Sequence, residues 1–277
     1  MRLQCIGNHL DERCIVDESQ TESGIFDCLK HILLSQDSIV FEEAYCPQIL
    51  AIRGVERRGH GWFQTGSASR FVQTPFGART HFSSNKNNYQ DTLMAVMWCE
   101  PGMQRVRLFS GVCNPSSLWP HGTAHLASGQ YFFKIGRHRT RETAHIESVR
   151  SASLQWPQDW VFDNTNDSIQ YIALEGTSSI EVIRSHGDYL DLCEDDFFKA
   201  ETGIAHADPV YVDAQRIKIN IHTCAVDHAS SLGCQNILPQ DYADFMSSLL
   251  DCRRKQIERY GFEVEIPYTL CDASYIE

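Results

Sequence analysis

The sequence predicts a mostly β fold with a few helices, an α+β domain. In residues 216–222, Ile217, Ile219 and Ile221 alternate with polar residues, as in a strand that buries one face. Residues 25–33 and 242–250 instead repeat their apolar residues at helical spacing. Short apolar runs separated by turn residues indicate further strands, so we expect the helices to cover a sheet.

The first half of the chain is expected to contain one helix and three strands. The helix covers 25–33, with Ser23 as its N-cap. A long excursion rich in Gly, Ser, Asn and Arg follows the first strand. The turn Glu100-Pro101-Gly102 joins the next two. The strands cover 48–53, 92–98 and 105–112.

The second half is expected to contain more strands and a second helix. A strand begins after Gly129 and ends at Gly136, and another ends at His222. Between them, 169–175 and 180–184 form a hairpin through Gly176. From Pro239 the pattern becomes helical, with basic residues near the expected last turn.

Composition excludes several classes of protein. The 277 residues carry 24 basic and 36 acidic side chains, a net charge of −12, so we expect no nucleic-acid partner. No apolar run is long enough for a membrane span, and the first residues do not form a secretory signal. The 11 cysteines are scattered and include no C-x-x-C pair, so most are expected to be buried free thiols.

The pattern with chemical content joins His222 to Cys234. A thiol becomes a good nucleophile when a base removes its proton, and an imidazole at a strand end can do this if the loop folds back. Gly233 permits a tight turn, so its amide and that of Cys234 are candidate oxyanion donors. Taken alone, such a pair is more often a packing contact.

The same residues resemble the YkuD-type L,D-transpeptidase family. Its signature is a strand-end histidine, a variable loop and then Ser-x-Gly-Cys, which Ser231 to Cys234 match in order. An upstream Gly-x-Tyr strand is matched by Gly129 to Tyr131, and His138 follows that strand. The chain departs from the pattern at three places. Thr223 stands where glycine is usual, and Leu232 differs from the usual residue of the cysteine motif. Gln235-Asn236 replaces a segment that contains the substrate arginine.

The resemblance implies an L,D-transpeptidase-like β-sandwich or barrel over residues 111–277, with 1–110 as an N-terminal extension. It implies a nucleophilic Cys234, with His222 as base and then acid. A backbone carbonyl, Ser231 or His138 orients the imidazole. The residues expected in the site are Cys234, His222 and Gly233, with Ser231, His138, Thr223 and Tyr131 in supporting or substrate-binding positions.

The implied substrate is the stem peptide of bacterial peptidoglycan. Water as acceptor gives an L,D-carboxypeptidase, and an amine gives exchange or cross-linking. Without a leader, the enzyme is expected to be made in the cytoplasm and to act in the periplasm or cell wall after non-classical export, as an antibacterial effector with an immunity protein or as a phage lysin. The alternative is a non-enzymatic module of a phage or secretion particle.

Two other chemistries are compatible with the sequence. His121, His125, His138 and His145 form a histidine-rich region that could bind zinc, but surface histidines are favoured, and we expect no metal or other cofactor. Cys224 could form a disulfide with Cys234 that inactivates the site, although a free buried thiol is favoured.

Overall fold

The computed structural model describes most of the chain and confirms a mostly β, α+β architecture. The described residues are 13–64, 69–73, 79–83, 92–113, 124–126, 128–177, 180–184, 211–213, 219–224, 234–273 and 276. The finer features below refer to these residues.

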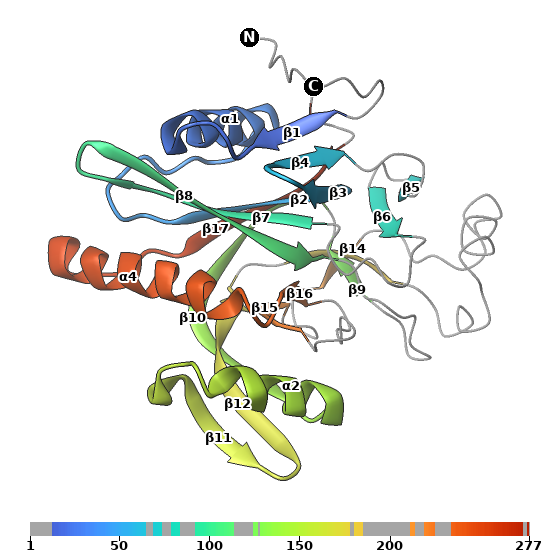
Figure 1. The fold of residues 1–277 in the computed structure, drawn as a ribbon, viewed down its shortest axis with the longest axis vertical. Coiled ribbons are helices and arrows are strands. Elements are labelled where there is room, and N and C mark those ends of the chain that lie inside the picture. The colour runs from blue at the N-terminus through green and yellow to red at the C-terminus, as the bar shows by residue number, and fades with distance from the viewer. Residues whose placement is uncertain are drawn as a thin grey trace.

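A mixed sheet of nine strands forms the centre of the molecule (Figure 1). Because β12 pairs with β10 as well as with β15, the strands close into a hydrogen-bonded ring, and β11 is a side branch on β12. In sheet order the strands are β10 (Gly129–Thr140), β17 (Ile266–Asp272), β2 (Gln48–Arg53), β7 (Thr92–Glu100), β8 (Met103–Val112), β16 (Gln235–Ile237), β15 (Asn220–Thr223), β12 (Ser168–Gly176) and β11 (Val161–Thr165).

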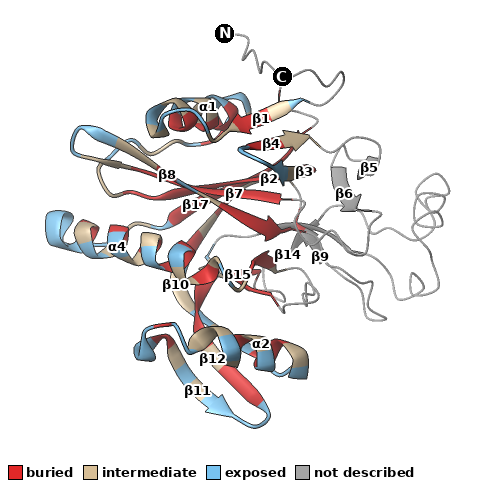
Figure 2. Cartoon of the chain, viewed as in Figure 1, coloured by how far each residue is buried: buried red, intermediate tan, exposed pale blue. Residues whose placement is uncertain are grey.

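Two helices cover opposite faces of this sheet. Side chains of a strand alternate between faces, and β2 and β7 are buried on both. Ile49 and Met94 pack on the side of α4 (Tyr242–Tyr260), whereas Leu50 and Leu93 pack on the side of α1 (Glu22–Ser35). Figure 2 shows these strands buried and the outer faces of the helices exposed.

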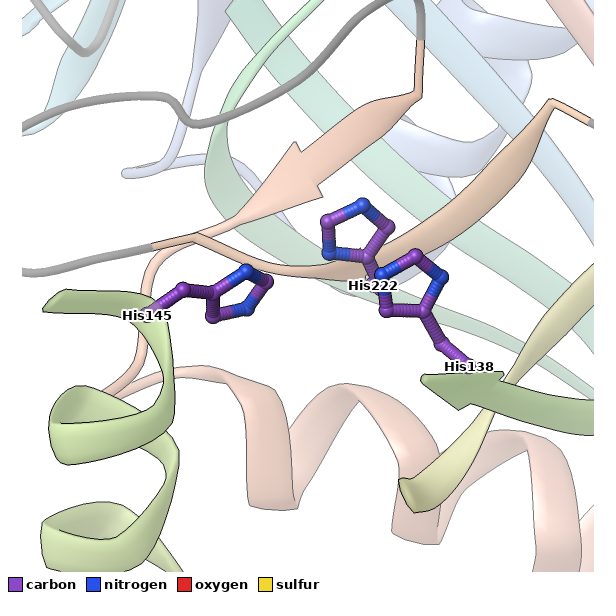
Figure 3. A group of neighbouring side chains, drawn as sticks. All are labelled: His138, His145 and His222. Carbon is purple, nitrogen blue, oxygen red and sulfur yellow. The ribbon is translucent and has the colours of Figure 1, made fainter. Parts of the chain in front are cut away.

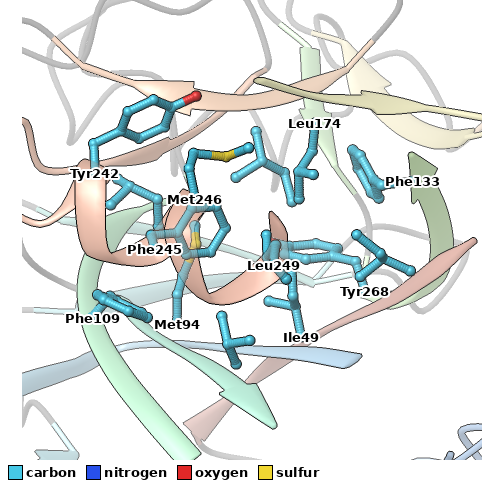
Figure 4. Packing of buried hydrophobic residues seen from close by; sticks show 14 of the residues in the cluster. Ile49, Met94, Phe109, Phe133, Leu174, Tyr242, Phe245, Met246, Leu249 and Tyr268 are labelled. Atoms are coloured by element: carbon cyan, nitrogen blue, oxygen red, sulfur yellow. The ribbon is translucent and has the colours of Figure 1, made fainter. Parts of the chain in front are cut away.

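The two helices confirm the apolar faces expected from their sequences. Figure 4 shows Tyr242, Phe245, Met246 and Leu249 of α4 packed against the sheet. Helix α4 runs beyond the basic residues expected to end it and stops at Gly261, whose φ of 80° is left-handed. In α1 the expected cap was wrong: Thr21 is the N-cap, and its hydroxyl accepts the Gly24 N–H at 3.1 Å, whereas Ser23 lies inside the helix.

An arm extends from the ring and carries part of the site. It consists of the later residues of β10, the first half of β12, β11, and the helices α2 (Thr143–Ser153) and η1 (Gln158–Trp160). Trp156 lies between Tyr171 of β12 and Tyr242 of α4, with ring centroids 5.8 and 5.2 Å away. The Tyr242 hydroxyl also donates to Ile172 O at 2.6 Å, so α4 holds the arm against the ring.

Three small sheets complete the described structure. They order as β1-β4-β3, β14-β13-β9 and β5-β6. Thus the expected hairpin of 169–175 with 180–184 was wrong, because β13 pairs with β9 and β14 rather than with β12. The strands are β1 (Cys14–Asp17), β3 (Val55–Arg58), β4 (Gly61–Gln64), β5 (Ser69–Gln73), β6 (Arg79–Ser83), β9 (Ala124–Leu126), β13 (Ile180–Arg184) and β14 (Tyr211–Asp213).

The sequence suggested a boundary at residue 110 between an N-terminal extension and a catalytic part. The central sheet contains strands from both sides of that boundary. That position falls within β8, and β2 lies between β7 and β17. Arg53 of β2 and Asp272 of β17 are in register and form a fully buried ion pair with two N–H···O distances of 2.9 Å. Residues from the two parts therefore share one sheet.

Among the described residues, the helices are too short or too polar to cross a bilayer.

Candidate functional site

The site lies at the parallel pair of β15 and β16, which are the shortest strands of the ring. The register pairs His222 with Asn236 and Ile221 with Gln235, and Cys234 directly precedes β16. Paired residues of parallel strands point to the same face, and side chains two residues apart share that face. Asn220, His222 and Asn236 therefore point to one face of the sheet, and Cys234 lies beside Asn220, whose backbone N–H contacts its sulfur.

The ring of His222 is held by the backbone of the next residue. Its Nδ1 lies 2.6 Å from Thr223 O. A carbonyl oxygen only accepts hydrogen bonds, so Nδ1 carries the proton and the neutral ring keeps its lone pair on Nε2. The group that orients the imidazole is thus a backbone carbonyl, one of the three alternatives left open by the sequence. The Thr223 hydroxyl donates to Cys224 O at 3.4 Å and is buried.

Two further polar side chains contact the same ring. The Tyr171 hydroxyl lies 3.4 Å from His222 Nδ1 and 3.0 Å from His145 Nε2, so it bridges the two imidazoles. Asn236 Nδ2 approaches His222 Nε2 at 3.4 Å and Nδ1 at 3.3 Å. These contacts are long, and the short bond to Thr223 O sets the orientation of the ring.

Three histidines from three different elements converge here (Figure 3). A nitrogen of His138 from β10, one of His145 from α2 and one of His222 all lie within 4.8 Å of one another. The rings of His138 and His222 stack with centroids 3.8 Å apart and an interplanar angle of 11°. His145 is only 1% exposed, so the prediction that it lies on the surface was wrong.

Burial fixes the charge of these rings. Desolvation, with a smaller contribution from His145, lowers the pKa of His138 to about 3. Desolvation, with His138 nearby, lowers the pKa of His222 well below its ordinary value, against the opposing effect of the bond to Thr223. Both imidazoles are therefore neutral at pH 7 and keep a lone pair that can accept a proton or bind an ion.

Asn220 links the thiol to the histidines. Its backbone N–H donates to Cys234 Sγ at 3.4 Å, which favours negative charge on the sulfur. Its side-chain Nδ2 lies 3.2 Å from His138 Nδ1. Among the described residues, the buried Oδ1 atoms of Asn220 and Asn236 accept no hydrogen bond from the protein. Such acceptors are uncommon in folded proteins and mark a place where a polar group from outside the chain can bind.

The structure does not gather all of the residues expected from the sequence. Tyr131 lies seven residues before His138 on β10, about 23 Å along the strand, and packs in the core opposite Tyr268. Gly233, Ser231 and His121 lie outside the described residues.

The disulfide considered between Cys224 and Cys234 is not formed in the structure. Neither Cys224 nor Cys234 takes part in a disulfide, and Cys224 is buried. Thr223 is paired with Ile237, so Cys224 lies one step further along the strand pair, at a level four residues from Cys234. That offset is about 13 Å, well beyond the span of a disulfide.

Sequence reasoning missed Tyr171, Asn220 and Asn236, and it placed His145 on the surface. Asn220 and His222 are two residues apart, as are Cys234 and Asn236, so strand alternation was the available signal for the two asparagines. No local signal places Tyr171 or His145 there, because β12 and α2 reach the site only through the arm.

Comparisons of the chain with known protein families, with curated proteins and with solved structures found no match.

Proposed function

We propose that the chain is a cysteine-nucleophile enzyme of the L,D-transpeptidase type that acts on peptidoglycan stem peptides. The observation that carries the proposal is the hydrogen bond from the Asn220 backbone to the Cys234 sulfur, which places the thiol beside the strand of His222, with Nδ1 of that imidazole held by Thr223 O. The Ser231-to-Cys234 signature supports the choice of substrate class. The corresponding fold is the family's β-sandwich or barrel, with which the closed ring of strands is compatible.

The geometry supports proton transfer during attack rather than a resting ion pair. Because burial lowers the pKa of His222, an imidazolium is disfavoured before substrate binds. The Cys234 sulfur attacks the carbonyl carbon of the L,D peptide bond as its proton passes to Nε2 of His222. The amine of the terminal D-residue then leaves with that proton, and the acyl group remains as a thioester on Cys234.

The second half of the reaction restores the thiol. Water, or the amine of another peptide or of a D-amino acid, attacks the thioester carbonyl and gives a proton to His222 Nε2. The thiolate leaves and takes that proton back, which closes the cycle with no net change in the enzyme. Water yields a shortened stem, and an amine yields an exchanged or cross-linked one.

The test uses purified full chain and tetrapeptide muropeptides, with and without an added D-amino acid, read by mass spectrometry. Wild type is expected to remove or exchange the terminal D-residue, and Cys234→Ala is expected to do neither. Cys252→Ala, which removes a buried thiol of α4, is the matched control and is expected to remain active. Equal activity in wild type and Cys234→Ala would contradict the proposal.

The biological setting follows from the same proposal. An enzyme on stem peptides acts in the periplasm or cell wall, as an antibacterial effector or a phage lysin. An effector requires an immunity protein, which would bind over Cys234 and block access to it. Purified chain added to stem peptides together with such a protein should lose its activity, and unchanged activity would contradict this assignment of the partner.

One observation favours a non-enzymatic module instead. His222 is only 1% exposed, and a buried imidazole limits the access of a substrate. The rate at which iodoacetamide alkylates Cys234 separates the two functions. A base that takes the thiol proton speeds this reaction, so His222→Asn should slow it if the pair is catalytic. An equal rate in the two proteins would favour the structural module.

A further inference from the structure

The cluster of His138, His145 and His222 offers more than the mechanism above uses. That mechanism requires one imidazole, yet three are brought within 4.8 Å from β10, α2 and β15 (Figure 3). His145 and His222 are each about 1% exposed. Burying His145 and His222 beside a third imidazole has a desolvation cost, and a packing role is filled more easily by apolar side chains.

We propose that His138, His145 and His222 bind one divalent transition-metal ion of the zinc class, and that the bound ion withdraws His222 from Cys234. Among the described residues, the group contains three imidazoles and no Asp, Glu or Cys side chain. Neutral imidazole nitrogens suit Zn²⁺, Co²⁺, Ni²⁺ or Cu²⁺, whereas Mg²⁺ and Ca²⁺ require oxygen ligands. Three protein ligands leave a fourth position of a tetrahedral ion for water or another small ligand.

The surroundings of the rings support this assignment. Metal-binding histidines are usually held by a polar group on the nitrogen that does not bind the ion. Here Thr223 O contacts His222, the Asn220 amide contacts His138, and the Tyr171 hydroxyl contacts His145. The Asn220 amide can be reversed so that its oxygen accepts from His138 Nδ1, which leaves the lone pair on Nε2. A hydroxyl both donates and accepts, so Tyr171 fits either tautomer of His145.

Binding requires a modest contraction of the cluster. Bonds of about 2.1 Å in a tetrahedral site hold the ligand nitrogens about 3.4 Å apart. The three nitrogens, now within 4.8 Å, must move together, and His138 must turn out of its stack on His222. A water on the fourth position would bring donors to this region, where the buried Oδ1 of Asn236 lacks a protein partner among the described residues.

The consequence for the enzyme rests on the proposed function. Cys234 is not part of the three-histidine group, so the ion does not need the thiol as a ligand. An ion on His222 takes the lone pair that would accept the thiol proton. Metal would therefore inhibit the cysteine chemistry, and a chelator would restore it.

Metal binding is tested directly with Co²⁺, whose visible absorption reports tetrahedral coordination. Metal-free full chain is expected to bind one equivalent that Zn²⁺ displaces. His145→Gln, and separately Tyr171→Phe as a milder change, should weaken binding by at least about tenfold. The control is His31→Gln, an exposed histidine of α1, which should bind as wild type does. Thermal melts confirm that each variant is folded.

The outcomes separate this inference from the proposed function. Cys234→Ala should keep Co²⁺ binding within a few fold while losing activity. Wild-type activity should fall with one equivalent of Zn²⁺, and that of His145→Gln should need far more ion for the same fractional loss. Wild type that binds no Co²⁺, or His145→Gln that binds as tightly, would overturn the inference and leave the cysteine mechanism standing. A protein active only when loaded with metal would uphold the site and overturn the cysteine mechanism.

Discussion

The buried ion pair of Arg53 and Asp272 is expected to control the stability of the sheet. Both side chains are 0% exposed, and the two N–H···O bonds of 2.9 Å are joined by bonds from Arg53 to Leu126 O at 3.1 Å and to Ser128 Oγ at 2.8 Å. Removing one partner of such a pair leaves a buried charge unpaired, which costs about 3–5 kcal/mol. In a chain of this size the loss corresponds to a fall in Tm of roughly 6–20 °C.

A double-mutant cycle tests this reasoning. Arg53→Met and Asp272→Leu should each lower the free energy of unfolding by about 3–5 kcal/mol, measured by urea denaturation. The double variant removes both charges, so it should be no less stable than either single variant, a coupling of at least about 3 kcal/mol. Arg57→Met is the control, because the exposed Arg57–Glu18 pair contributes at most about 1 kcal/mol. Additive losses, or single losses below about 1 kcal/mol, would refute the argument.

Three further predictions concern the helix cap, the strand pair and pH. Thr21→Ala should lower the free energy of unfolding by about 1 kcal/mol and Ser23→Ala by less, in urea titrations; the reverse order would restore Ser23 as the cap. In Gly111→Ala the new Cβ would lie 2.8 Å from Asn236 O, so β16 must shift. We expect the free energy of unfolding to fall by about 1–3 kcal/mol and turnover to be reduced. A variant as stable and active as wild type would argue against this contact. In metal-free protein, the pKa values of His138 and His222 are lowered by folding. Below about pH 6.5 the unfolded chain therefore binds more protons than the folded protein, so stability falls as the pH drops from there toward 3. Each histidine contributes about 1.4 kcal/mol per pH unit to the slope of the free energy of unfolding against pH. His138→Gln should remove its share of that slope, measured by urea denaturation. An unchanged slope would mean that His138 is not held neutral.

The sequence predicted those parts of the fold that depend on local periodicity. The apolar residues of α1 and α4 lie on one face at helical spacing, and both helices bury that face. The two-residue turn at Pro101-Gly102 likewise identified the β7–β8 hairpin. The cap was assigned to Ser23 because several capping residues are adjacent there, and only the bond from Gly24 N to Thr21 decides among them.

Long-range pairing was beyond local patterns. The turn at Gly176 suggested a hairpin, but β13 leaves β12 and joins β9. The parallel pairing of β15 with β16 brings Asn220 and Asn236 beside His222, and no spacing in the sequence specifies that register.

Only part of the candidate site could be predicted, because the site also depends on long-range pairing. Cys234 lies beside the strand that carries His222, and the catalytic role of the two residues stays a prediction. His145 belonged to a histidine-rich segment that looked like an exposed turn, yet α2 buries it against Tyr171. The arm that carries α2 and β12 to the site is a tertiary feature, which local sequence patterns do not reveal.

The measurement that tests the central claim most directly is the intact mass of the protein during turnover of a tetrapeptide stem. The account predicts a transient adduct equal in mass to the shortened acyl peptide, located on Cys234, released by hydroxylamine and absent from Cys234→Ala. Turnover without that adduct, or loss of the terminal D-residue by Cys234→Ala, would contradict a thioester on Cys234 and with it the proposed function.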